Sequence, residues 1–453
     1  MLYSNEDATL FQNNLIMSEQ LELPFMTEFN HRKTTLTNSG TFINNMNLPI
    51  HRWFRYSAGF SAQWAEKIIL NFINNQSPST PNHHTTILDP FVGAGTTLLA
   101  ADRYQVHSLG IEAHIFIARI AKIKLFWATS IDQFTQKAQQ ILTEALTIKT
   151  VDLTYPKLIS QCFSETALTQ LTQLKTAWEK LNDQSPASEL IWLAINTILR
   201  QTSAVGTAQW QYILPNKTKA SVLEVFTAFQ SQIERMKIDM EIWQKTQNSS
   251  LANLILGDAR HCPEIPDQSI DLVISSPPYA NNYDYADATR LEMSFWGEVT
   301  RWGDLHQVIR KSLIVSSAQH ASLEKLNLPE ILQSHLLDTI KNELDEICDQ
   351  LSRERLLHGG KKHYHTMVAG YFLDMAKVLI ELKRVCKRPS QICLMIGDSA
   401  PYGIYVPVEE FLGKLAIASG FNDYSFEKVR DRNKKWKNRK HRVPLKEGIL
   451  WIY

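Results

Sequence analysis

The sequence predicts an α/β protein built on a doubly wound, Rossmann-like parallel sheet that is interrupted by two largely helical insertions. Two observations carry this prediction. Apolar strands alternate with amphipathic helices in three blocks, residues 49–130, 251–296 and 366–453. The stretches between these blocks, residues 131–250 and 297–365, show mostly the spacing of apolar residues that is typical of helices.

The first block begins with an amphipathic helix over residues 61–74 and continues in the order strand, helix, strand, helix. The four segments are TTILDP (85–90), TTLLAADRY (96–104), VHSLGIE (106–112) and HIFIARIAKIKLFWA (114–128). Parallel strands need a crossover connection, and a helix between two strands supplies it. The block therefore predicts parallel strands with helices on the faces of the sheet.

The later blocks supply the remaining strands. The predicted elements are strands at ANLILGDAR (252–260) and IDLVIS (270–275), a helix over 371–386, a strand at ICLMIGD (392–398), a helix over 406–420 and a closing strand near GILWIY (448–453). Gly420 suits the end of a helix, because glycine readily adopts the left-handed conformation common there.

Composition excludes several classes of protein. With 44% apolar and 21% charged residues, the 453-residue chain resembles a folded globular protein, and its net charge of +1 leaves nucleic-acid contacts to local clusters of charge. The five cysteines include no Cys-x-x-Cys pair, so neither a disulfide framework nor a metal site is predicted. No apolar run approaches the ~18 residues that span a bilayer, and the N-terminus lacks a signal-peptide pattern. We therefore expect a soluble protein of the reducing cytosol without membrane contact.

A glycine-bearing turn follows the strand TTILDP. It reads Asp-Pro-Phe-Val-Gly-Ala-Gly-Thr over residues 89–96, and its G-x-G lets the backbone turn tightly and approach a ligand. Leu98 stands where a dinucleotide fingerprint has its third glycine, and no Gly-Lys-Ser/Thr follows, so neither an NAD site nor a P-loop is predicted. The remaining interpretation is a site for an adenosine-bearing ligand without a pyrophosphate. In that site Glu112 would accept from the ribose hydroxyls and Asp258 would face the adenine edge. A plain strand–helix turn is the alternative, and Asp258 alone is almost equally explained as a cap or turn residue.

The tetrapeptide Ser276-Pro277-Pro278-Tyr279 directly follows the strand IDLVIS. Prolines cannot continue the ladder of a strand, so backbone carbonyls there face the cleft at the carboxyl ends of the strands, beside the glycine turn. A hydroxyl, a free carbonyl and an aromatic ring at one point suit a planar base that carries an amino group. Alone, these four residues would be a chance match or a plain turn. Together with the glycine turn they indicate a base-modifying site.

With both segments in place, the sequence resembles the DNA amino-methyltransferases, which make N4-methylcytosine or N6-methyladenine, as bacterial modification methylases do. The resemblance implies S-adenosylmethionine as the cofactor and double-stranded DNA as the substrate. It extends to HRWFRYSAGFS (51–61), which looks like the segment that completes the methionine pocket, and to residues 384–399 and 420–432. The site residues that it implies are catalytic Ser276, Pro277, Pro278 and Tyr279, and cofactor-binding Phe60, Asp89, Pro90, Phe91, Gly93, Gly95, Thr96, Glu112 and Asp258.

The resemblance also implies a mechanism in which the target base is flipped out of the duplex and its amino nitrogen attacks the sulfonium methyl in line. Ser276 and the Pro277 carbonyl would accept from the amino group, and Tyr279 would stack on the base. In this family serine at the first tetrapeptide position accompanies mostly cytosine N4, and Asp or Asn accompanies adenine N6. We therefore predict N4-cytosine methylation, with N6-adenine methylation as the alternative. The cofactor motifs precede the tetrapeptide here, whereas many N4-cytosine enzymes have the permuted order.

Other activities have less support in the sequence. C5-cytosine methylation needs a cysteine nucleophile, typically in a Pro-Cys pair, and the chain has no such dipeptide. RNA base methyltransferases share the two motifs but usually carry Asp or Asn before the prolines and an RNA-binding appendage. A subunit that only binds DNA would be expected to have lost Gly93, Gly95 or the tetrapeptide oxygens, and all are present.

The resemblance divides the chain into six parts. They are an N-terminal arm (1–48), a SAM-binding half (49–130), a helical insertion that is a candidate for target recognition (131–250), a catalytic half (251–296), a second insertion (297–365) and the rest of the sheet with a basic segment (366–453).

Three segments could hold DNA. Residues 428–442 contain nine Lys and Arg but one Asp, which favours phosphate contacts over a merely solvated face. Residues 200–217 suit base reading and a plain linker equally well, and residues 281–287 are predicted to line the base pocket rather than form a surface turn. A cognate restriction endonuclease is a further expected partner, and the expected location is the bacterial cytoplasm near the nucleoid. The DNA contacts predicted in the basic run are Lys434, Lys435, Lys437, Arg439, Lys440 and Arg442.

Overall fold

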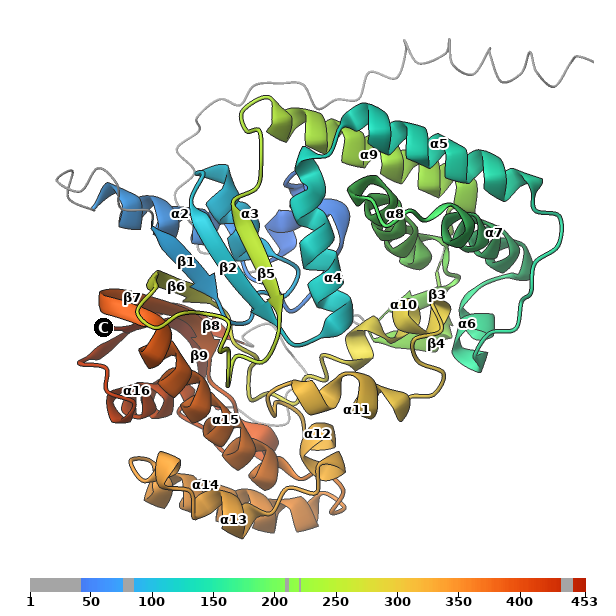
Figure 1. The fold of residues 1–453 in the computed structure, drawn as a ribbon. Helices are drawn as coiled ribbons and strands as arrows, with labels where there is room; N and C mark the ends of the chain where they lie inside the picture. The colour runs from blue at the N-terminus through green and yellow to red at the C-terminus, as the bar shows by residue number, and fades with distance from the viewer. Residues whose placement is uncertain (1–41, 76–84, 208–211, 220, 433–442) are drawn as a thin grey trace, which may run out of the picture. The chain divides into compact units, whose positions relative to one another are not determined.

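A seven-stranded sheet lies at the centre of the protein (Figure 1). The computed structural model describes residues 42–75, 85–207, 212–219, 221–432 and 443–453. The strand order is β5-β2-β1-β6-β7-β9-β8; the first five are parallel, and β9 runs antiparallel to its neighbours β7 and β8. The expected α/β fold with a mostly parallel sheet is confirmed. The strands are β1 (Thr86–Asp89), β2 (His107–Glu112), β5 (Ala252–Leu256), β6 (Ile270–Ser275), β7 (Cys386–Gly397), β8 (Tyr424–Arg432) and β9 (Leu445–Ile452).

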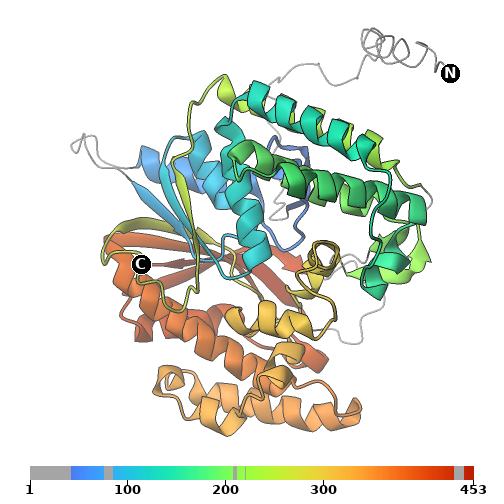
Figure 2. The same cartoon turned by 45° about the vertical axis from the view of Figure 1, so that its right-hand side comes forward.

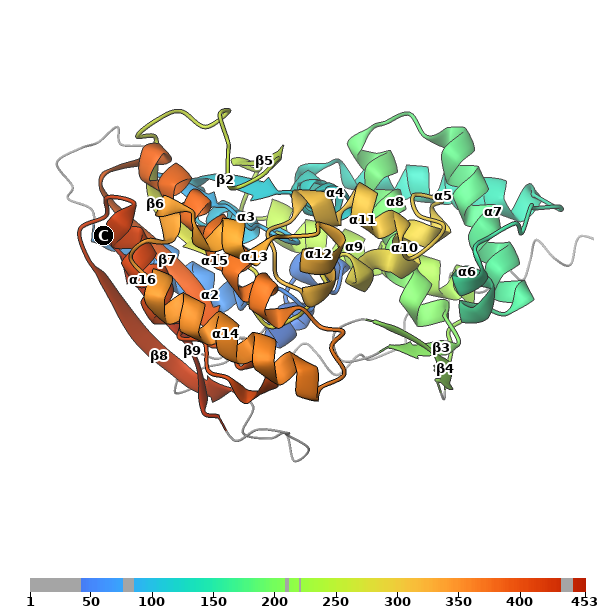
Figure 3. The same cartoon turned by 90° about the horizontal axis from the view of Figure 1, so that it is seen from below.

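Helices cover both faces of this sheet, because successive strand residues point to opposite sides. Ile87 and Leu272 pack with α2 and α3 on one face, whereas their neighbours Leu88 and Val273 pack with α15 and α16 on the other. Figure 3 shows α15 and α16 together, with β8 and β9 beside α16. The four helices are α2 (Ala62–Asn74), α3 (Thr96–Arg103), α15 (Tyr364–Val385) and α16 (Val408–Ala418).

The chain between β2 and β5 forms a helical body (Figure 2), and its apolar cluster also includes residues from after β6, such as Leu291 and Phe295. Its central helix is α8, in which residues 190–195 are all fully buried. Serine caps begin three of the helices: Ser130, Ser164 and Ser185 each accept a hydrogen bond from the backbone N–H three residues on. The elements are α4 (Ile115–Lys124), α5 (Ile131–Thr147), α6 (Lys157–Cys162), α7 (Glu165–Leu181), α8 (Pro186–Thr202), the hairpin β3 (Val205–Thr207) and β4 (Ile213–Thr218), and α9 (Val225–Gln244).

The chain between β6 and α15 has no core of its own. Apolar residues of its short helices, such as Ile331, Leu344 and Leu351, belong to the same apolar cluster as α15 and the sheet. None of the described helices is long and apolar enough to cross a membrane. The helices of this segment are α10 (Arg290–Phe295), α11 (Asp304–Val308), α12 (Ala318–Leu323), α13 (Leu328–Leu332) and α14 (Lys341–Leu357).

The end of the predicted N-terminal arm packs against the segment predicted to complete the methionine pocket. Phe42–Asn47 form a 3-10 helix, and Asn45 in it is buried. The Asn45 side chain donates to the carbonyl of Phe60 (2.8 Å) and accepts from the backbone N–H of Ala62 (2.9 Å). Asn45 therefore holds the chain just before α2. Residues 1–41 of the arm lie outside the described residues.

Candidate active site

The turn after β1 and the tetrapeptide after β6 lie side by side at the carboxyl edge of the sheet. β1 pairs with β6 in parallel, with Leu88 opposite Val273. β2 and β5 extend the sheet on one side of β1, and β6 and β7 extend it on the other side. The strand order therefore reverses between β1 and β6. Ligands of open α/β sheets bind at such a switch point. The two segments singled out in the sequence therefore share one end of the sheet.

Two glycines shape the turn from β1 into α3. Gly93 and Gly95 have φ angles of 52° and 90°, a region that residues with a Cβ rarely adopt. A Cβ on Gly93 would also stand 3.1 Å from Cε1 of Tyr56. The Gly93 N–H donates to Oε2 of Glu112 (2.9 Å), and Oε1 of the same carboxylate accepts from the His114 N–H (2.9 Å). Glu112 thus holds the turn in place, and burial raises its pKa to about 7.

Asp89 lies beneath the turn, and its carboxylate accepts three hydrogen bonds from the protein. Oδ1 accepts from the Ser275 hydroxyl (2.6 Å) and the Phe91 N–H (3.0 Å), and Oδ2 accepts from the Thr97 hydroxyl (2.5 Å). The side chain is fully buried, which raises the pKa of Asp89 to about 6 in spite of these hydrogen bonds. Asp89 therefore ties β1, β6 and α3 together from below.

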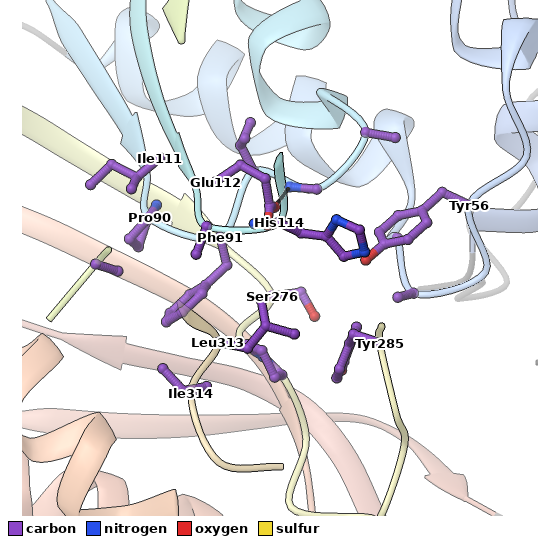
Figure 4. A pocket seen from close by; sticks show the side chains of 18 of the residues that line it. Tyr56, Pro90, Phe91, Ile111, Glu112, His114, Ser276, Tyr285, Leu313 and Ile314 are labelled. Carbon is purple, nitrogen blue, oxygen red and sulfur yellow. Dashed lines mark hydrogen bonds between the residues drawn. The ribbon is translucent and has the colours of Figure 1, made fainter. Parts of the chain in front are cut away.

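A pocket of about 750 Å³, part of it open to solvent, lies above the two strand ends (Figure 4). Most of the predicted site residues line it, from both the cofactor group and the tetrapeptide. Those that line it are Phe60, Pro90, Phe91, Gly93, Thr96, Glu112, Asp258, Ser276 and Pro278. Those outside its lining are Asp89, Gly95, Pro277 and Tyr279. One cavity therefore receives both the glycine turn and the first residue of the tetrapeptide.

The Ser276 hydroxyl is held by the neighbouring strand. It donates to the carbonyl of Met395 in β7 at 3.1 Å. A hydroxyl has one proton and two lone pairs, so with the proton used in this way its lone pairs are the groups left to meet a ligand. In this position Ser276 is suited to accept a hydrogen bond inside the pocket.

Tyr279 is not among the residues that line the pocket. Its backbone N–H donates to the hydroxyl of Tyr285 (3.3 Å), and Tyr285 does line the pocket. Burial raises the pKa of both tyrosines, so their hydroxyls stay protonated at neutral pH. Tyr285 comes from residues 281–287, the segment predicted to line the base pocket.

Several lining residues were not predicted from the sequence, among them His114 and residues 312–314, whereas Tyr56 belongs to the segment predicted to complete the methionine pocket. His114 is buried, and its Nε2 lies 2.9 Å from the Thr289 hydroxyl. Burial lowers the pKa of His114 to about 3, so the ring is neutral at physiological pH. Its place two residues after Glu112, at the end of β2, was a usable signal. Residues 312–314 come from the second insertion and carry no motif that would have indicated them.

The carboxylate of Asp258 is fixed by an arginine on the same turn. Arg260 donates to it from Nε and Nη2 at 2.7–3.0 Å, and Nη1 of Arg260 lies 3.0 Å from Asp374 in α15. Arg260 also reaches the carbonyl of Ser312 (3.4 Å), which lines the pocket. The predicted adenine-facing residue is therefore joined to the second insertion.

The first insertion also reaches the site. The hydroxyl of Tyr212, which immediately precedes β4, accepts from the backbone N–H of Asp284 (2.9 Å), and its ring packs 5.6 Å from that of Tyr283. Arg200, at the end of α8, pairs with Glu292 in α10 (2.5 Å). Residues 200–217, which suit base reading and a plain linker equally well, thus contact the loop that follows the tetrapeptide.

The predicted DNA contacts cannot be placed in this way. Lys434, Lys435, Lys437, Arg439, Lys440 and Arg442 lie outside the described residues. The described part of the same basic run belongs to β8, where Lys428 pairs with Asp431 and Arg430 with Glu447.

Comparison with known proteins agrees with this geometry. The family model for DNA methylases of the N6/N4 type matches residues 21–123, which include the glycine turn and Glu112. The type II methyltransferase M.BsoBI of Geobacillus stearothermophilus is 26% identical over 450 residues, covering 90% of this chain and 86% of its own. Along most of its length, the chain is similar to DNA amino-methyltransferases.

A second relative is similar over nearly the same length of chain. The type II methyltransferase M.AvaI of a Nostoc species is 25% identical over 458 residues, which is 92% of this chain and 88% of the relative. No solved structure matches the chain. DNA amino-methyltransferases use S-adenosylmethionine as the methyl donor, so the pocket is the candidate site for that cofactor.

Proposed function

We propose that this DNA amino-methyltransferase is a site-specific type II enzyme that methylates N4 of cytosine, with N6 of adenine as the alternative. The observation that carries the proposal is that one pocket is lined both by Gly93 and Glu112 and by Ser276. A methyl transfer needs the donor and the acceptor nitrogen in contact, and a pocket shared by the two strand ends allows this.

The residues on the cofactor side fit S-adenosylmethionine. Gly93 has a positive φ and no side chain, so its backbone can form the wall of the pocket. A Cβ at this position would take up space beside Tyr56. Glu112 uses each oxygen for one backbone N–H and keeps further lone pairs for two ribose hydroxyls. Asp258, held by Arg260, is available to the adenine amino group. When bound, the cofactor supplies an electrophilic methyl group on a sulfonium.

On the base side, the protein acts by accepting hydrogen bonds. The lone pair of an exocyclic amino group is delocalised into the base, which makes the nitrogen a poor nucleophile. Ser276 would accept from one N–H, and the Pro277 carbonyl from the other, which favours the pyramidal nitrogen and stabilises the positive charge that develops on it. Tyr279 would hold the base by stacking on it. A base must leave the duplex to reach a pocket at a sheet edge, so we infer that the enzyme flips its target base.

The choice of cytosine comes from Ser276, since serine at this position accompanies mostly cytosine N4 in the family. A restriction endonuclease as partner is proposed because both relatives are named type II methyltransferases. The same names support a defined DNA recognition sequence.

The proposal is tested by nucleoside mass spectrometry on DNA from cells that express the chain, with Ser276→Ala at matched expression as the control. We expect N4-methylcytosine with the wild-type chain and a marked reduction with the variant. N6-methyladenine would change the base assignment and keep the mechanism. Neither modified base, in a preparation that binds S-adenosylmethionine, would contradict the proposal.

A further inference from the structure

An arginine of the C-terminal hairpin covers the ring of Tyr279. Cζ of Arg432, the last residue of β8, lies 5.0 Å from the centre of that ring. This is within the range of cation–π attraction. Arg432 thus brings the edge of the sheet to the residue that the proposed function uses to hold the base.

The guanidinium of Arg432 is fixed by two further contacts. Nη1 donates to the carbonyl of Asp398 (2.8 Å), and Nε lies 3.6 Å from Oε2 of Glu447 in β9. The Glu447 side chain is buried and also pairs with Arg430 (2.8 Å). A buried carboxylate is strongly destabilised without a cationic partner, so Glu447 restrains both arginines.

Gly397, the last residue of β7, leaves the space that the two side chains occupy. A Cβ at this position would stand 2.7 Å from Nη1 of Arg432 and 3.1 Å from Cε2 of Tyr279. The φ of Gly397 is not positive, so the requirement here is for space and not for an unusual backbone conformation. The strand end, the hairpin and the tetrapeptide therefore meet at one point.

We propose that Arg432 is a positioning residue that holds the Tyr279 ring in the orientation in which it stacks on the target base. The backbone of Tyr279 is already held by the Tyr285 hydroxyl. The Tyr279 hydroxyl also interacts with the Ser276 side chain, and the guanidinium adds a restraint at the face of the ring. The inference rests on the proposed function, because it concerns the stacking role of Tyr279.

A double-mutant cycle on the full-length enzyme tests this coupling, with radiolabelled S-adenosylmethionine and unmethylated plasmid DNA as substrates. Arg432→Gln should lower kcat/KM for DNA about tenfold, the size expected of a partly desolvated cation–π contact. On the Tyr279→Leu background the same substitution should change kcat/KM by less than about twofold, because the ring on which it acts is gone. The Kd for S-adenosylmethionine should stay within about twofold of wild type in each variant, which also shows that the pocket is folded.

Two further variants separate this role from others. Arg432→Lys keeps a cation near the ring and should recover most of the loss. Arg430→Gln disturbs the same Glu447 but not Tyr279, so its fold effect should be equal on both backgrounds. Equal fold losses from Arg432→Gln on both backgrounds would mean that Arg432 acts on DNA or on the fold directly, and would overturn the inference. Full activity of Tyr279→Leu alone would instead remove the stacking role from the proposed function, and the inference with it.

Discussion

The two sides of the active site are assembled in different ways. On the cofactor side, Glu112 accepts hydrogen bonds from the backbone N–H groups of Gly93 and His114, all within one strand–helix–strand stretch of the chain. On the base side, Ser276 is held by Met395, which lies 119 residues further along, and the Tyr279 ring is covered by Arg432. The cofactor side can therefore be recognised as a continuous motif, whereas the base side acquires its geometry only when the sheet is complete.

The largest expected effect comes from a substitution on the cofactor side. Gly93→Val forces a β-branched residue into a φ of 52° and places its Cβ against the Tyr56 ring. We expect loss of measurable S-adenosylmethionine binding by titration calorimetry, while the melting temperature shows that the protein still folds. Retained binding in Gly93→Val would mean that the cofactor does not approach this turn.

A substitution on the base side should slow methyl transfer and leave cofactor binding intact. Ser276→Ala removes the acceptor held by Met395, and turnover should fall about 100-fold, as when one hydrogen-bonding group is removed from a charge-stabilising site. The Kd for S-adenosylmethionine should remain nearly unchanged. Normal turnover in single-turnover methylation assays would show that the catalytic assignment of Ser276 is wrong.

Asp89 joins the two sides, so its replacement should act on stability. Asp89→Asn keeps the shape but replaces one acceptor oxygen with a donor among Ser275, Thr97 and the Phe91 N–H. We expect the free energy of unfolding in urea to fall by about 2 kcal/mol, the cost of one poorly satisfied buried polar group. A loss below about 0.5 kcal/mol would indicate that the hydroxyls rearrange at little cost.

The smallest effect is a pH dependence of cofactor affinity. Burial raises the pKa of Glu112 to about 7 from an ordinary value of 4.5, so its contribution to stability is full below pH 4.5 and is lost as the pH rises through about 7. The ribose hydroxyls need the ionised carboxylate, so affinity for S-adenosylmethionine should rise by up to about tenfold between about pH 6 and 8. Glu112→Gln should bind more weakly and show a flat profile. The same pH dependence in the variant would assign the titration to another group.

The alternation of strands and helices made the parallel sheet predictable, and the turn signals placed Gly93 and Ser276 at neighbouring strand ends. Two matters could not be predicted. A carboxylate at a strand end does not reveal whether it faces a ligand or, like Asp89, the hydroxyls beneath the turn. Helical periodicity does not reveal which surface a helix buries. The apolar cluster that the first insertion shares with Leu291 and Phe295, and the entry of Ser312 into the pocket from the second insertion, therefore both required the structure.

A structure of the enzyme with S-adenosylhomocysteine tests most directly the claim that both strand ends form one active site. We predict that both ribose hydroxyls donate to the carboxylate of Glu112. The sulfur should also lie within about 8 Å of the Ser276 hydroxyl, which leaves room for one methyl group and one amino nitrogen between them. A ligand bound at Glu112 with its sulfur turned away from Ser276, or bound outside this pocket, would contradict the account.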